Sequence, residues 1–139
     1  MSGGAKAESK RKPRLLHLHS SFDPGGKEVR TVKLMNLFGT GIEHAVVSSL
    51  AEARGAAHLI DPRLSVAWPA FPDLAGRPFP RRLQRLAEAM RGYDLVLTYN
   101  WGAMDAVMAH TLFGEWLQLP PLVHHEDGFN EDEAGGLKP

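Results

Sequence analysis

Residues 15–30 constrain the fold of this chain more than any other stretch. Residues 15–20 alternate apolar and polar side chains, which is typical of a β-strand. An Asp-Pro-Gly-Gly turn follows, and residues 26–38 then show the apolar spacing of a helix. A strand that passes through glycines into a helix N-terminus can hold an anion on its backbone N–H groups. The sequence therefore predicts an anion-binding turn at Gly25 and Gly26.

The glycine spacing of this turn separates it from two common nucleotide-binding motifs. It matches neither GxGxxG nor GxxxxGK[ST], which argues against an ordinary dinucleotide fingerprint and against a P-loop. A bare Gly-Gly turn also has a purely structural interpretation, in which the glycines only allow the helix to pack against a sheet. Both interpretations of the turn stay open at this point.

The rest of the chain repeats the alternation of strand and helix patterns. Strands are expected at 15–20, 44–50, 64–68, 94–100 and 122–125, and helices at 26–38, 80–91 and 101–113. Residues 51–60 fit a short helix or an irregular turn, and 69–80 form a proline-rich loop. This order predicts an α/β fold: a three-layer, Rossmann-like domain with a parallel sheet of about five strands and helices on both faces.

The apolar residues of each expected helix gather on one side, where we expect them to enter the core. They are Val29, Val32, Leu34, Met35 and Phe38 in the first helix, Leu83, Leu86, Ala87 and Met90 in the second, and Trp101, Met104, Ala106, Val107, Met108 and Leu112 in the third. The opposite side of the second helix carries Arg81, Arg82 and Arg85, either as solvated surface or as a patch for lipid headgroups.

Composition excludes several classes of function. The chain of 139 residues is long enough for one domain with its own core. It has no cysteine, which rules out disulfides, Cys-zinc sites and a thiol nucleophile. A net charge of +0 gives no overall attraction to nucleic acid, and we expect no nucleic-acid partner.

The N-terminal segment predicts no export signal. Residues 1–13 are basic and lack the apolar centre of a signal peptide, so we expect a flexible tail ahead of a domain at 14–130. No apolar run approaches the length of a membrane span. We expect a cytoplasmic protein, with contact to the inner membrane face through basic residues as an alternative.

Polar side chains gather where the expected strands end. Ser20 ends the first strand, Asn100 ends the strand at 94–100, and His124 and His125 end the last. Ligands of open parallel sheets bind beyond these carboxyl ends. His124 and His125 are adjacent in a strand and so face opposite sides, which argues against a shared metal ion. His17 and His19, in the middle of the first strand, are expected to be hydrogen-bonded core histidines.

Three stretches together resemble a known enzyme family. They are Leu18–Glu28, Asp94–Asp105 and Pro121–Phe129, and they are similar to the N-terminal, acceptor-side domain of bacterial family 4 glycosyltransferases. The resemblance implies a GT-B architecture, in which two Rossmann-like domains face each other across a cleft. It also implies a retaining transfer of a sugar from a nucleotide-sugar to a saccharide or lipid-linked acceptor, with no cofactor besides that co-substrate.

The resemblance also implies roles for individual residues. Family members often carry a histidine just before a glycine in the reaction centre; here Asp127 precedes Gly128, and two histidines lie upstream. The expected catalytic residues are therefore His124, His125 and Asp127, with no metal ligands. The residues expected to bind the nucleotide-sugar are Ser20, Gly25, Gly26, Lys27, Asn100 and Glu126.

The family's second domain, which binds most of the nucleotide-sugar, has no counterpart in these 139 residues. We expect residues 131–139 to be an unfinished tail and the isolated chain to be inactive. An alternative from another class is a non-catalytic, Rossmann-like interaction module, whose exposed apolar surface would favour a homodimer. A nicotinamide-dependent oxidoreductase is disfavoured because GxGxxG is missing.

Overall fold

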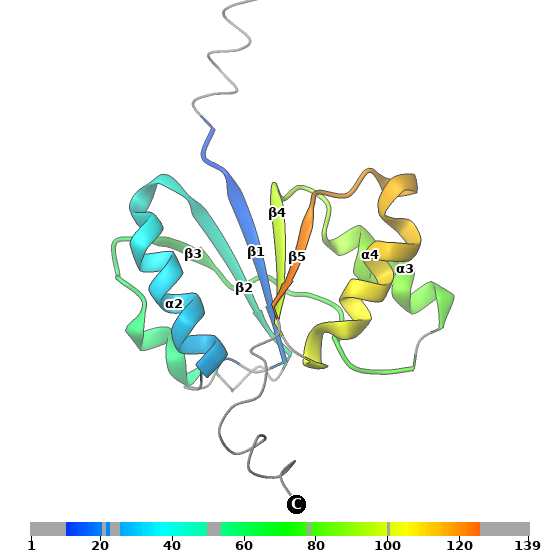
Figure 1. The fold of residues 1–139 in the computed structure, drawn as a ribbon, viewed down its shortest axis with the longest axis horizontal. Helices are drawn as coiled ribbons and strands as arrows, with labels where there is room; N and C mark the ends of the chain where they lie inside the picture. Colours follow the sequence, from blue (N-terminus) through cyan, green and yellow to red (C-terminus); the bar gives the residue numbers. More distant parts are fainter. Residues whose placement is uncertain are drawn as a thin grey trace, which may run out of the picture.

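The computed structural model describes residues 11–20, 22, 26–49, 54–77, 79–99 and 101–125. They form one parallel sheet in the order β3-β2-β1-β4-β5 (Figure 1). The strands are β1 (Arg14–His19), β2 (Glu43–Ser48), β3 (Ser65–Ala67), β4 (Leu95–Tyr99) and β5 (Leu122–His125). All four strand pairings are parallel, because the chain returns to the same end of the sheet before each new strand.

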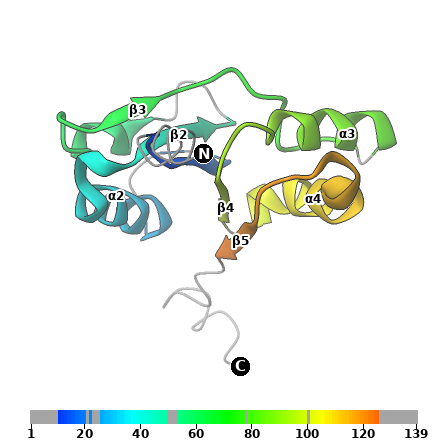
Figure 2. The same ribbon diagram turned by 90° about the horizontal axis from the view of Figure 1, so that it is seen from above.

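Helices cover both faces of the sheet. The helix α2 (Gly26–Phe38) lies on one face, and α3 (Pro80–Ala89) and α4 (Met104–Leu117) lie on the other (Figure 2). Short 3-10 helices occupy Gly39–Gly41, Gly55–Leu59 and Trp101–Ala103. The prediction of a three-layer, Rossmann-like α/β fold with a five-stranded parallel sheet is confirmed.

The core is divided by the sheet into layers because successive strand side chains point to opposite faces. Leu16 and Leu18 of β1 pack with Leu83 and Leu86 of α3 on one side. On the other side, residues such as Val46 of β2 pack with α2. Both faces of the central strands are therefore covered, which agrees with the apolar run at 45–47 in β2.

The strand order reverses between β1 and β4. From β1 the chain moves outward through β2 to β3, then returns to β4 on the other side of β1 and continues to β5. In sheets of this kind the crevice for a ligand lies at the carboxyl ends of the two strands that flank the reversal. A ligand site is therefore expected at the segments that follow β1 and β4.

Element boundaries agree with the sequence patterns at most places. The helix at 26–38 and the strand at 122–125 are confirmed as predicted. The third predicted helix differs, because residues 101–103 form a 3-10 turn and α4 continues to Leu117. It ends at Gln118, whose left-handed backbone (φ 52°) closes the last turn.

Two of the helix faces differ from the prediction. Leu83, Leu86, Ala87 and Met90 are buried as expected, but Phe38, Met108 and Leu112 are exposed. The prediction for these three was wrong for different reasons. Phe38 lies at the last position of α2, whereas α4 buries Ala106 and Ala109 in the core and leaves Met108 and Leu112 exposed. Small residues at a contact let a helix approach closely.

Arg82 also departs from its expected place on the solvent face of the second helix. Its guanidinium donates to the Asp105 carboxylate at 2.8 Å and to the Asp73 carbonyl at 2.9 Å. Arg81 and Arg85 are exposed as predicted. Arg82 therefore joins α3, α4 and the preceding loop, and only the other two arginines form a basic surface.

The N-terminal segment touches the sheet before β1 begins. Arg11 bonds to the Asp94 carboxylate at 2.8 Å, and the Pro13 carbonyl accepts from the Glu43 amide at 2.9 Å. Residues 1–10 of the predicted N-terminal tail and the whole predicted tail at 131–139 lie outside the described residues. Within the part of the chain that is described, no helix is both long and apolar enough to cross a lipid bilayer.

Candidate functional site

The carboxyl ends of β1, β4 and β5 lie side by side and bring several predicted residues to one edge. β1 ends at His19 and is followed by Ser20, β4 ends at Tyr99, and β5 ends at His125. The first turn of α2 lies at the same end of the sheet as the strand arrowheads (Figure 1). The N-terminus of α2 contributes positive potential there because its first N–H groups have no intrahelical partner.

Ser20 packs against Gly102 across the strand-order reversal. A Cβ atom added to Gly102 would lie 2.4 Å from the Ser20 Cβ and 2.5 Å from its Oγ. No real side chain fits at that distance, so glycine is required at position 102. The segment after β1 and the turn after β4 are therefore in direct contact.

Three aromatic rings form a stack at this edge, on the face of the sheet that α2 covers. The His19 and Tyr99 ring centroids are 4.1 Å apart and nearly parallel, at 10°. The His125 ring lies 4.9 Å from Tyr99 on the neighbouring strand, at 19°. Stacked rings fix one another's rotamers, so Tyr99 holds the His125 imidazole in place.

A hydrogen-bonded chain of buried rings continues from Tyr99 into the sheet. The Tyr99 hydroxyl lies 3.1 Å from His17 Nδ1, and His17 Nε2 lies 2.9 Å from His44 Nδ1. Burial, followed by the neighbouring His44 and His125, lowers the pKa of His17 from 6.5 to about 3. His17 is therefore neutral at physiological pH. The prediction that His17 and His19 are buried core histidines is confirmed.

His124 lies on the opposite face from His125, as expected for neighbours in a strand. Its Nδ1 atom is 2.7 Å from the Thr98 hydroxyl of β4. Thr98 follows Leu97 and precedes Tyr99, so it points toward the α3 and α4 layer. Of the two predicted catalytic histidines, only His125 shares a face with α2.

Two buried polar residues of α2 were not predicted from the sequence. Glu28 and Thr31 are 4% and 0% exposed, and the Thr31 hydroxyl lies 3.5 Å from His19 Nε2. With Val32 and Met35 they occupy positions i, i+3, i+4 and i+7, the spacing of one helix face. The spacing alone could have placed Glu28 and Thr31 on the buried face of α2. They were not predicted there because only apolar residues were assigned to that face.

The remaining predicted site residues are only partly described. Gly26 and Lys27 open α2. Gly25, Asn100, Glu126 and Asp127 lie outside the described residues. Among the residues that the structure describes, no three His, Cys, Asp or Glu side chains converge in a way that could hold a metal ion.

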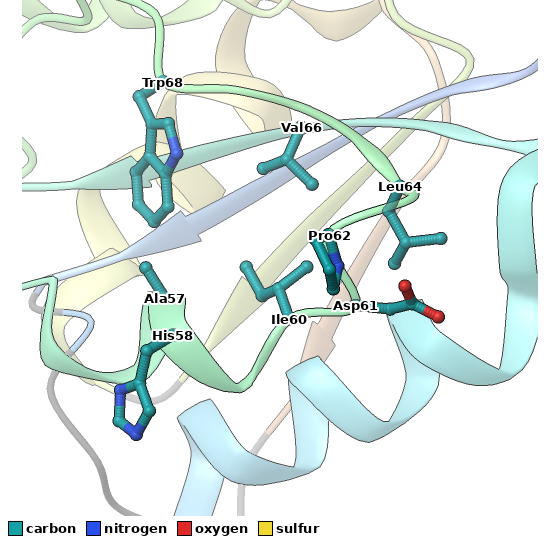
Figure 3. Close-up of a pocket in the computed structure, with 8 residues that line it drawn as sticks. All are labelled: Ala57, His58, Ile60, Asp61, Pro62, Leu64, Val66 and Trp68. Atoms are coloured by element: carbon teal, nitrogen blue, oxygen red, sulfur yellow. The ribbon is translucent and has the colours of Figure 1, made fainter.

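A separate hollow of about 380 Å³ lies beside β3, between that strand and the 3-10 helix Gly55–Leu59 (Figure 3). Its lining residues are Ala57, His58, Ile60, Asp61, Pro62, Leu64, Val66 and Trp68. The Asp61 carboxylate pairs with Arg63 at 2.7 Å, and this hydrogen-bonded partner lowers the pKa of Asp61 to about 2. The walls are mostly apolar, so this hollow offers little acid–base chemistry.

Comparison with known proteins adds no family to this description. No protein-family model matches the chain, and no curated protein matches it significantly.

Proposed function

We propose that this chain is the N-terminal, acceptor-side domain of a retaining glycosyltransferase of the GT-B type. In this proposal the complete enzyme transfers a sugar from a nucleotide-sugar to a saccharide or lipid-linked acceptor. The 139 residues supply one wall of the cleft, and a second domain supplies most of the donor site. The isolated chain binds nucleotides weakly and turns over little or nothing.

The observation that carries the proposal is the convergence at the strand-order reversal. Ser20 after β1 touches the turn after β4, and the first turn of α2 lies at the same edge. Ligands of doubly wound sheets bind at this place, and a helix N-terminus there stabilises a phosphate. Glycosyl transfer from a nucleoside diphosphate needs such stabilisation, because negative charge develops on the leaving group.

The proposal gives separate roles to the residues at this edge. The backbone amides of Gly26 and Lys27 face the donor diphosphate, which takes the proton of the acceptor hydroxyl as the sugar–phosphate bond breaks. His125 orients that hydroxyl. An imidazole suits this orienting role because its ring nitrogens can accept and donate hydrogen bonds. Tyr99 acts as a positioning residue, since its ring stacks on His125 at 4.9 Å.

The test is a titration of the ¹⁵N-labelled chain with UDP, GDP and their sugar conjugates. The proposal expects amide shifts at Ser20, Gly26 and Lys27, with dissociation constants on the order of 1 mM because half of the cleft is absent. The variant Gly26→Asp should abolish these shifts, since it adds negative charge where the phosphate binds.

A matched control is available at the other end of the same helix. Gly41 follows α2 and has open space around it, so Gly41→Asp adds the same charge without a clash. Gly41→Asp should leave nucleotide binding unchanged. If no nucleotide shifted any amide signal of the wild type, the proposed donor site would be contradicted. Robust sugar transfer by the chain alone would contradict the proposal that it supplies only one wall of the cleft.

A non-catalytic interaction module is a second candidate. The observation in its favour is the set of large apolar side chains exposed on α4, which a catalytic role at the carboxyl edge does not explain. This candidate would be favoured if nucleotides shifted no amide signals and the chain associated with itself or with a partner through α4.

A further inference from the structure

A row of large apolar side chains lies on the outer side of α4. Met108, Leu112 and Trp116 are spaced four residues apart and are 43%, 61% and 69% exposed. The half-buried Met104 begins the same row one turn earlier. We call Met104, Met108, Leu112 and Trp116 the α4 ridge, because side chains at i and i+4 form a continuous ridge along a helix.

The fold of the single chain leaves Met108, Leu112 and Trp116 of the α4 ridge exposed. α4 packs on the sheet and α3 through other residues, among which Ala106 and Ala109 are fully buried. α4 is therefore apolar on two sides, although a helix at the surface of a monomer usually has a polar outer face. Contiguous exposed apolar side chains of this kind mark interaction surfaces.

We propose that the α4 ridge is a homodimer interface, in which α4 of one copy packs antiparallel on α4 of a second copy. The proposed two-fold axis crosses the helix midway between Met108 and Leu112. It places Met108 of one copy against Leu112 of the other copy. The same axis sets Met104 against Trp116, a favourable thioether–aromatic contact. Ridges at i+4 spacing interdigitate when two such helices cross, so the surface is complementary to itself.

The charges on α4 disfavour docking on an anionic membrane surface. Helices that lie in a membrane interface are rich in Lys and Arg on their polar side. α4 contains neither residue, and its ionisable residues other than histidine are Asp105 and Glu115. The Asp105 carboxylate already pairs with Arg82 at 2.8 Å. The whole chain has a net charge of +0, so long-range repulsion between two copies is small.

The exposed area predicts a weak dimer. The exposed parts of Met108, Leu112 and Trp116 amount to roughly 350 Å² per copy, since side chains of this size present about 150–250 Å² each. Stable interfaces bury about 800 Å² per partner, so the exposed side chains of the ridge supply less than half of that area. The dimer is therefore expected to be weak and to form only at high protein concentration.

Sedimentation equilibrium of the full chain from low micromolar to about millimolar concentration tests the proposal. The apparent mass should rise from 15.3 kDa toward twice that value. Leu112→Glu should remain at the monomer mass throughout, because the substitution buries two like charges near the two-fold axis. Circular dichroism of the variant verifies that it folds.

Leu37→Glu is the matched control, since Leu37 is 82% exposed on α2, away from the ridge. It should dimerise as the wild type does, and dilution of the labelled wild type should move amide signals mainly within residues 104–117. A wild type that stays monomeric overturns the proposal, as does association that Leu112→Glu leaves unchanged. Binding of the monomer to anionic vesicles with no dimer at any concentration also overturns it.

Discussion

Ser20 and Gly102 lie so close together that position 102 accepts no side chain. A Cβ atom there would stand 2.4 Å from the Ser20 Cβ, well inside van der Waals contact. The contact joins the segments that leave β1 and β4, the two strands at which the strand order reverses. It therefore holds the segment after β1 against the turn after β4.

The first prediction concerns Gly102→Ala. The added methyl forces the Ser20 segment and the turn before α4 apart, and we expect a loss of about 1–3 kcal/mol in the free energy of unfolding. Urea denaturation measures this loss. The double variant Gly102→Ala with Ser20→Gly removes the clashing Cβ and should recover most of it.

Gly114→Ala is the control for that experiment. Gly114 lies inside α4, and a Cβ there meets the His110 ring at an ordinary 3.5 Å. Alanine is preferred to glycine inside a helix, so this variant should be more stable by about 0.5–1 kcal/mol. If Gly102→Ala proved as harmless as Gly114→Ala, the described contact with Ser20 would be wrong.

The second prediction concerns Arg82, which holds the loop before α3. Its guanidinium reaches the Asp105 carboxylate and the carbonyls of Asp73 and Arg77 at once. A lysine keeps the charge but not the planar fork of donors, so Arg82→Lys should lower the free energy of unfolding by about 1–2 kcal/mol. Arg81→Lys, at an exposed neighbour, should change it by less than about 0.5 kcal/mol. Equal effects of both would contradict the role of Arg82.

The order of strands and helices was predictable from the sequence because each element has its own repeat of apolar residues along the chain. The apolar stripe of α3, with Leu83 and Leu86, has a single possible buried side, and the structure confirms it. α4 was less predictable because apolar residues surround it, so its period does not say which side meets the sheet. Only the close approach of Ala106 and Ala109 in three dimensions selects that side.

The contacts of the candidate site were less accessible to sequence reasoning. His17 meets His44 and Tyr99, which are 27 and 82 residues away, because β1 lies between β2 and β4. No local sequence pattern predicts contacts between residues so far apart in the chain. The separation of His124 and His125 onto opposite faces was predictable, since it depends only on the alternation within one strand.

The third prediction is a loss of stability in mild acid. Burial, together with His44 and His125, lowers the pKa of His17 from 6.5 to about 3 in the folded chain. Between these two values the unfolded chain binds a proton that the folded chain excludes. The contribution of His17 is therefore complete above pH 6.5 and is lost as the pH falls toward 3, with a slope of about 1.4 kcal/mol per pH unit.

His17→Gln tests the origin of that slope, because glutamine forms hydrogen bonds but does not titrate. Urea denaturation between pH 6 and pH 4 should show a slope smaller by about 1.4 kcal/mol per pH unit in the variant. His58→Gln, at an exposed histidine, should leave the wild-type slope in place. An unchanged slope in His17→Gln would show that another group titrates instead.

The fourth prediction separates the two functions of Tyr99. Its hydroxyl lies 3.1 Å from His17 Nδ1, while its ring stacks between His19 and His125. Tyr99→Phe removes only the hydroxyl and should cost about 1–2 kcal/mol of unfolding free energy, because a buried partner loses its hydrogen bond. Tyr99→Leu also removes the ring stack and should lower the free energy of unfolding by about 1 kcal/mol more. The ring proton signals of His125 should move strongly in Tyr99→Leu, which removes the aromatic ring current, and little in Tyr99→Phe. If both variants moved them equally, Tyr99 would not position His125 through its ring, and the stack would have no part in the candidate site.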